Sequence, residues 1–165
     1  MWVKDYMKDC FNTISPEKTL SEAVKQMIEQ KVNSLIVVDE DKKPIGLVTS
    51  HGMIKEVVPG YLKDDPTYAQ FGAEGTLDKY AEMAKDKKVA DFMYKEFHLL
   101  NDKDPMIEAA SYLIEGERRT LPVVDETGKL VGVITRTCVK KALHNAIFKD
   151  SQIDPKECDC LEHTQ

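Results

Sequence analysis

Short apolar runs separated by polar turns mark two β-hairpins in this chain. Residues 121–124 and 130–134 are aliphatic and rich in β-branched side chains, and the polar segment between them contains Gly128. β-Branched residues favour a pleated backbone and glycine can adopt the positive φ of a tight turn, so this pattern predicts a hairpin. The same alternation occurs earlier in the chain and predicts another hairpin over residues 34–49.

Apolar residues at helical spacing predict amphipathic helices around the hairpins. Before the first hairpin, Thr19 and Glu22 have the spacing of a capping box, and residues 11–14 are expected to form a strand. Before the second, residues 97–100 are the expected strand and Asp104 is the expected helix cap. The apolar positions are Leu20, Ala23, Val24, Met27 and Ile28, then Met106, Ala109, Ala110, Leu113 and Ile114, and finally Val139, Ala142, Leu143, Ala146 and Ile147.

The two hairpins belong to one internal repeat with a constant offset of 86 residues. Between residues 3–57 and 89–143, about 17 of the 55 paired positions are identical without any gap. Solenoid repeats are shorter and need three or more copies, so a pseudo-symmetric pair is expected instead.

The predicted fold class is α+β, with two pseudo-symmetric repeats of the order β-α-β-β-α. One such unit is too small to bury both faces of its sheet, so we expect the repeats to pack sheet to sheet, with two clefts between them. The predicted boundaries are residues 1–58 for the first repeat and 89–149 for the second. A linker over 59–88 should contain a helix capped by Thr76 and serve as a surface connector, a lid or a docking arm. The polar tail, residues 150–165, is expected to be poorly ordered.

The composition is that of a soluble globular protein, with 42% hydrophobic and 32% charged residues. No apolar run is long enough to span a membrane, and we expect neither a signal peptide nor membrane association. The net charge of −6 argues against a nucleic-acid partner. The four cysteines show no disulfide framework, so we expect reduced thiols and a cytoplasmic location.

The repeated segment with its order β-α-β-β-α resembles a tandem pair of CBS domains, a Bateman module. The resemblance rests on Leu-Pro-Val-Val-Asp followed by Gly-Lys-Leu-Val-Gly-Val-Ile-Thr in residues 121–135, and on the matching segment 35–49. It implies a regulatory module that binds an adenosine-containing ligand, namely AMP, ADP, ATP or S-adenosylmethionine, in a cleft between the repeats. It also implies a homodimer and a regulated partner protein, which the sequence does not identify.

The ligand-binding pattern of this family is Gly-h-h-Thr-x-x-Asp, where h is apolar and the Asp accepts both ribose hydroxyls. Thr49 and Thr135 are present here, but Gly52 and Cys138 stand at the two Asp positions. Losing a charged acceptor weakens binding by roughly 1.5–3 kcal/mol. The ligand-binding residues that the resemblance implies are Thr13, Ile14, Ser34, Leu35, Ile36, Thr49, Leu99, Leu100, Arg119, Thr120, Leu121, Pro122, Thr135, Arg136 and Cys138.

The two clefts are expected to differ in charge. The second repeat contains Arg118, Arg119 and Arg136, whose planar guanidinium groups suit phosphate oxygens. The alternative is that these arginines are solvated residues of a loop and a helix start. The aligned residues of the first repeat are Val32, Asn33 and Ser50, which carry no charge. An anionic ligand is therefore predicted in the cleft lined by Arg119, Thr135 and Arg136, with the Cys138 thiol facing its mouth.

No catalytic or metal site is predicted. There is no Ser-His-Asp arrangement, no paired carboxylates and no phosphate-binding glycine loop, so we expect no enzyme. Cys158, Cys160 and His163 lack the spacing of a structural zinc site and are better explained as a disordered tail. Two alternatives to the nucleotide sensor remain, namely an interaction scaffold that has lost ligand binding and a thiol or metal sensor built on the tail.

Overall fold

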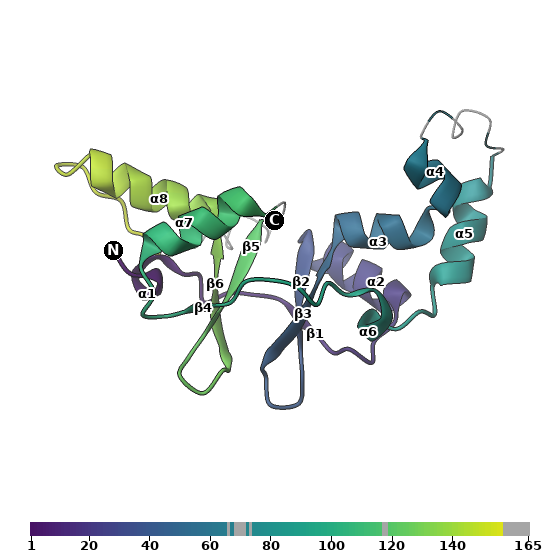
Figure 1. Ribbon diagram of the computed structural model, residues 1–165, viewed down its shortest axis with the longest axis horizontal. Coiled ribbons are helices and arrows are strands. Elements are labelled where there is room, and N and C mark those ends of the chain that lie inside the picture. The colour runs from purple at the N-terminus through teal and green to yellow at the C-terminus, as the bar shows by residue number, and fades with distance from the viewer. Residues whose placement is uncertain (66, 68–71, 73, 117–118, 157–165) are drawn as a thin grey trace. The chain divides into compact units, whose positions relative to one another are not determined.

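The computed structural model contains two three-stranded sheets, each accompanied by helices (Figure 1). It describes residues 1–65, 67, 72, 74–116 and 119–156. No helix in these ranges is long and apolar enough to cross a bilayer. The elements in chain order are α1 (Val3–Tyr6), β1 (Thr13–Ile14), α2 (Leu20–Gln30), β2 (Ser34–Val38), β3 (Pro44–Thr49), α3 (Ser50–Val57), α4 (Gly60–Asp64), α5 (Thr76–Ala84), α6 (Val89–Phe92), β4 (Leu100–Asn101), α7 (Met106–Glu115), β5 (Thr120–Val124), β6 (Leu130–Thr135) and α8 (Arg136–Ile147).

Both repeats have the predicted order and the predicted α+β class. In the first sheet β1 pairs with β2 in parallel, and in the second β4 pairs with β5 in parallel. Helices α2 and α7 make the crossovers that parallel neighbours require. The second hairpin is confirmed by the antiparallel pairing of β5 with β6, in which Thr120 lies opposite Thr135. β3 adjoins β2 in the first sheet, as the first hairpin predicts.

The leading strands are shorter than predicted and begin later. Residues 11–14 and 97–100 were the expected strands, whereas β1 and β4 contain two residues each. The cause is the pairing just before them. Lys8 exchanges backbone hydrogen bonds of 2.9 and 3.0 Å with Val133, so residues 9–12 connect that contact to β1. Tyr94 does the same with Leu47, at 2.8 and 2.9 Å, before β4.

Each repeat is covered by the short helix that precedes the other repeat. The backbone N–H of Val3 in α1 donates to Asp104 of the second repeat at 2.8 Å, and that of Val89 in α6 donates to Lys18 of the first at 2.8 Å. One compact unit therefore consists of Met1–Asn12, Val38–Ile45 and Glu96–Gln165, and the other of Thr13–Val37 and Gly46–Lys95. The motif glycines admit this packing, because a Cβ on Gly132 would lie 2.9 Å from the Met7 sulfur.

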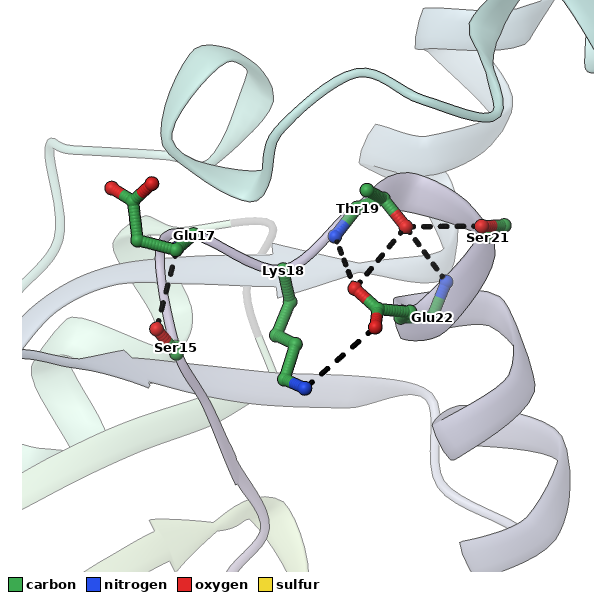
Figure 2. Close-up of polar contacts among 6 residues, drawn as sticks. All are labelled: Ser15, Glu17, Lys18, Thr19, Ser21 and Glu22. Atoms are coloured by element: carbon green, nitrogen blue, oxygen red, sulfur yellow. Dashed lines mark hydrogen bonds and ion pairs between the residues drawn. The ribbon is translucent and has the colours of Figure 1, made fainter.

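The capping box of α2 is confirmed. The Thr19 hydroxyl accepts a hydrogen bond from the backbone N–H of Glu22 at 3.3 Å, and the Glu22 carboxylate accepts one from the backbone N–H of Thr19 at 2.9 Å (Figure 2). This bond from the Thr19 backbone is the main reason that the pKa of Glu22 lies below its ordinary value.

Two other predicted helix starts are wrong by one residue. The N-cap of α5 is Gly75, with φ of 87°, rather than Thr76, because glycine accepts the left-handed backbone that leads into this helix. The N-cap of α7 is Pro105, and the Asp104 carboxylate instead accepts the backbone N–H of Asn101 at 2.7 Å, which closes the turn before the helix.

The start of the tail is ordered, contrary to the prediction. The side chain of Asn145 in α8 donates to the carbonyl of Ile153 at 3.0 Å and accepts from its N–H at 2.9 Å. Residues 150–156 therefore fold back on the helix, while residues 157–165 lie outside the described ranges.

The cysteines also differ from the prediction. Cys10 is disulfide-bonded, so the expectation of reduced thiols is wrong for this residue. Cys138 is free and buried. Cys158 and Cys160 lie outside the described residues.

Candidate functional site

Each hairpin ends at a threonine that also begins the following helix. Thr49 is the N-cap of α3 and Thr135 is the N-cap of α8, both with extended backbone. The N–H groups of a first helical turn point toward the N-cap, so anions are stabilised there. The predicted ligand end of each repeat thus combines a hydroxyl with a helix N-terminus.

In the first repeat, an acidic side chain at position 52 would require neighbouring residues to move. The Thr49 hydroxyl accepts the backbone N–H of Gly52 at 3.0 Å. A Cβ on Gly52 would lie 3.0 Å from the ring of Tyr94 and 3.3 Å from that hydroxyl. Tyr94 itself is fixed by its backbone bonds to Leu47. The absence of a side chain at Gly52 therefore lets α6 and the residues after it pack against this repeat.

In the second repeat, the Cys138 thiol does not face a cleft mouth, and the prediction is wrong. The side chain is 1% exposed and lies in the apolar core with Val3 and Ile134. Its sulfur accepts the backbone N–H of Thr135 at 3.4 Å and lies 3.4 Å from the Thr135 hydroxyl. As the third residue of α8 it points back along the helix toward the cap, which explains its direction.

Two arginines flank the paired strand ends before α8. Arg119 directly precedes β5 and Arg136 directly follows β6, so both flank the strand ends at which Thr120 pairs with Thr135. Both are exposed, and neither guanidinium makes an ion pair with any residue that the structure describes. The first turn of α8 contains no acidic residue. The result is a positively charged edge that suits an oxyanion such as phosphate. Arg118 lies outside the described residues.

The corresponding edge of the first repeat is nearly neutral. The backbone N–H of Ser50 donates to the carbonyl of Asn33 at 3.0 Å, so the residues aligned with the two arginines are also neighbours. Beside them lies a groove of about 370 Å³, lined by Val24, Met27, Ile28, Lys31, Val32, Asn33, Ser50 and Met53. The predicted difference in charge between the two clefts stays a prediction; within each unit, the aligned residues are charged in the second repeat and uncharged in the first.

The other predicted ligand residues divide into two groups by burial. Thr13, Ser34 and Thr120 are half-buried and Leu99 is 43% exposed, so their side chains can reach a ligand. The fully buried members belong to the cores and can offer only backbone groups; they are Ile14, Leu35, Ile36, Leu100, Leu121 and Pro122. Their part in ligand binding stays a prediction.

A stacked pair near Leu99 was not predicted from sequence. The rings of His98 and Tyr112 are parallel, with centroids 4.0 Å apart, and His98 Nε2 lies 3.7 Å from the carboxylate of Glu115. The Tyr112 hydroxyl donates to the Glu108 carboxylate at 2.8 Å, and this bond raises the pKa of Tyr112. The available signal was Tyr112, an aromatic residue with a hydroxyl that lies next to the apolar stripe of α7.

No group of three or more metal-ligating side chains occurs in the part of the chain that the structure describes. The sequence Cys158–His163, weighed above as a metal site, falls outside it.

Comparison with known proteins identifies the family. The CBS domain family matches residues 3–59 and 89–145, which together make up more than half of the chain. The chain belongs to the CBS-domain family, whose paired members act as regulatory modules.

Relatives and solved structures agree with this assignment. The chain is 31% identical over 144 residues to the chloroplastic CBS domain-containing protein CBSX1 of Arabidopsis thaliana, covering 82% of this chain and 60% of that protein. It thus spans less than two thirds of the length of this relative. The structure is similar to CBSX2 from Arabidopsis thaliana, with a TM-score of 0.73, 26% identity and coverage of 91% and 98% of the two chains. It also matches CBSX2 in complex with AMP, with a TM-score of 0.66, 26% identity and coverage of 88% and 98%.

Proposed function

We propose that this protein is a regulatory module that binds an adenine nucleotide, with Arg119 and Arg136 holding the phosphate. The observation that carries the proposal is the arginine pair at the N-terminus of α8, beside the Thr135 hydroxyl. A structurally similar relative has been crystallised with AMP, which supports an adenine nucleotide as the ligand. One guanidinium group can donate two parallel hydrogen bonds to phosphate oxygens, and the partial positive charge of the helix N-terminus favours the bound anion.

The proposed affinity is moderate. Neither repeat has the ribose-binding acid, since Gly52 and the buried Cys138 occupy its positions. The loss of roughly 1.5–3 kcal/mol corresponds to a factor of about ten to a hundred in the dissociation constant. We therefore expect binding in the micromolar to millimolar range, with AMP, ADP, ATP and S-adenosylmethionine as the ligands to compare.

The proposed mechanism is a shift in the relative geometry of the two repeats, read by a regulated partner protein. A ligand shifts such an equilibrium only through its different affinities for the two arrangements. We also propose that the module works as a homodimer. Helices of both repeats leave large apolar side chains exposed, among them Ile28 of α2 and Ile114 of α7.

A second candidate is an interaction scaffold without a nucleotide. Two observations favour it: the ribose-binding acid is missing from both repeats, and a side chain at Gly52 would meet Tyr94. Under this reading the arginines are solvated surface residues.

Thermal denaturation with saturating nucleotide separates the two functions. A ligand at a hundredfold excess over its dissociation constant stabilises the fold by about 2.7 kcal/mol, which gives a clear melting shift. Arg119→Ala should lose most of this shift, while the matched variant Asn33→Ala in the first repeat should keep it. Equal losses in both variants, or no shift with any of the four adenosine compounds, would support the scaffold.

A further inference from the structure

The N-terminal segment, residues 1–12, covers the second repeat at its core and at the edge of its sheet. Val3 and Tyr6 of α1 are buried in the core cluster of that repeat. Lys8 exchanges backbone hydrogen bonds of 2.9 and 3.0 Å with Val133 of β6, which is an outer strand of the sheet. An uncovered edge would leave backbone groups open to pairing with another strand. The position of this segment therefore decides whether the β6 edge is accessible.

Two residues after Lys8, the segment carries an exposed cysteine, Cys10, that is disulfide-bonded. The chain contains four cysteines. Cys138 is free and buried, so it is not the partner. Within one chain this leaves Cys158 or Cys160 of the tail, both of which lie outside the described residues. A bond to either would link the N-terminal segment to the tail.

The described part of the tail is held on the same unit as the N-terminal segment. Asn145 of α8 bonds the carbonyl and the N–H of Ile153, at 3.0 and 2.9 Å, and α1 packs against α8 (Figure 1). Ile153 stands five residues before Cys158 in the chain. The Asn145 contact does not depend on the disulfide, so the thiols of the reduced protein stay at a high effective concentration. The bond can therefore break and form again while the unit stays folded.

We propose that Cys10 and one of the two tail cysteines form a reversible thiol–disulfide switch that sets how firmly the N-terminal segment covers the β6 edge. The reductant is a dithiol. One of its thiolates attacks a sulfur of the bond, which releases one protein thiol and forms a mixed disulfide, and its second thiol then releases the other protein thiol. The protein gains two electrons and two protons, and the dithiol becomes a disulfide. Exposed disulfides such as that of Cys10 are the ones that this exchange reduces most readily.

The two states differ in how easily the N-terminal segment opens. A disulfide between residue 10 and the tail closes a loop that spans nearly the whole chain, and the stabilisation from such a bond grows with loop length. In the reduced protein the segment is held by noncovalent contacts alone, such as the Lys8–Val133 pairing, and these open locally. The reduced protein therefore exposes the β6 edge more often, and an extended segment of another chain can pair there.

Amide hydrogen exchange followed by NMR tests the switch on the full chain, in the oxidised form and after reduction with dithiothreitol. The N–H groups of Lys8 and Val133 should exchange at least about tenfold faster in the reduced protein, because the contact between them opens more often.

The first repeat supplies the matched control. Tyr94 and Leu47 exchange the same pair of backbone hydrogen bonds, but Glu96 occupies the position aligned with Cys10. Exchange of the Tyr94 and Leu47 N–H groups should be the same in both redox states. Cys10→Ser removes the bond at an exposed site, so the folded variant should show the fast exchange of Lys8 with or without dithiothreitol.

Peptide mapping of the unreduced protein identifies the partner of Cys10. We expect a cross-link to Cys158 or Cys160, and the double variant Cys158→Ser/Cys160→Ser should then exchange as Cys10→Ser does. A Cys10 that stays a free thiol under oxidising conditions, or that links to a second copy of the chain, would overturn the proposal. Equal exchange of Lys8 and Val133 in the two redox states would overturn it as well. None of these measurements uses a nucleotide, so their outcome is independent of the proposed function.

Discussion

Asn145 is the one buried polar residue in the described part of the chain, at 7% exposure, and its amide bonds both the carbonyl and the N–H of Ile153. A buried amide that loses its partners costs more than an exposed one, because its desolvation is no longer offset. The contact therefore holds the chain after α8 against the helix. This makes Asn145 the residue on which the order of segment 150–156 depends.

Asn145→Ala should lower the free energy of unfolding by about 1–3 kcal/mol, because the N–H and carbonyl of Ile153 lose their partners. Urea denaturation followed by circular dichroism measures the change. Lys149→Ala, at an exposed position nearby, serves as the control and should be nearly neutral. A cost no larger than that of the control would show that the tail is not held by this side chain.

At this scale the sequence predicted which residues lie at the start of α8 but not how their side chains point. The 86-residue offset placed Thr135, Arg136 and Cys138 at the start of α8. It could not predict that the thiol turns back to Thr135 and into the core. That direction depends on α1, which supplies Val3 and Tyr6 to the same cluster from more than a hundred residues away in the chain.

Among the elements, the start of α2 was predicted in detail because all its determinants are local. The side chains of Thr19 and Glu22 each accept a hydrogen bond from the backbone N–H of the other residue, within one turn of the helix (Figure 2). The starts of α5 and α7 were misplaced by one residue, because the left-handed Gly75 and the turn closed by Asp104 depend on neighbouring loops. Differences of this size are common at helix ends.

Glu22→Gln should remove a pH-dependent part of the stability of α2. The folded-state pKa of Glu22 is lowered, chiefly by the Thr19 backbone N–H, so its stabilisation is present above the ordinary glutamate pKa and is lost as pH falls through the folded value. The melting temperature of the unchanged protein should exceed that of the variant at pH 7, and the difference should shrink below about pH 4. A difference that stays constant with pH would argue against the carboxylate as its source.

For the whole molecule, the repeat was visible in sequence but the exchange of segments was not. The offset aligned the segment of α1 with that of α6, yet gave no indication that each covers the sheet of the other repeat. The contacts responsible, such as Met7 on Gly132 and Met93 on Gly46, are long-range and leave no local pattern. The same exchange accounts for the short strands β1 and β4, because the residues before them connect two separate pairings.

The two repeats differ in charge at one edge because of a few sequence differences on a shared framework. Arg119 and Arg136 stand where Asn33 and Ser50 stand in the first repeat, so the edge of one unit carries two guanidinium groups that the aligned positions of the other lack. This difference underlies the proposed function, in which the charged edge binds phosphate.

The most direct test of the nucleotide proposal is isothermal titration calorimetry of the unchanged protein with AMP and, separately, with adenosine. Because the arginine edge is proposed to hold the phosphate, AMP should bind in a saturable manner with a dissociation constant in the micromolar to millimolar range. Adenosine, which lacks the phosphate, should bind at least about tenfold more weakly, a difference of 1.4 kcal/mol. Equal affinities for the two compounds, or no binding of AMP by folded protein, would contradict the assignment of Arg119 and Arg136 to a nucleotide phosphate.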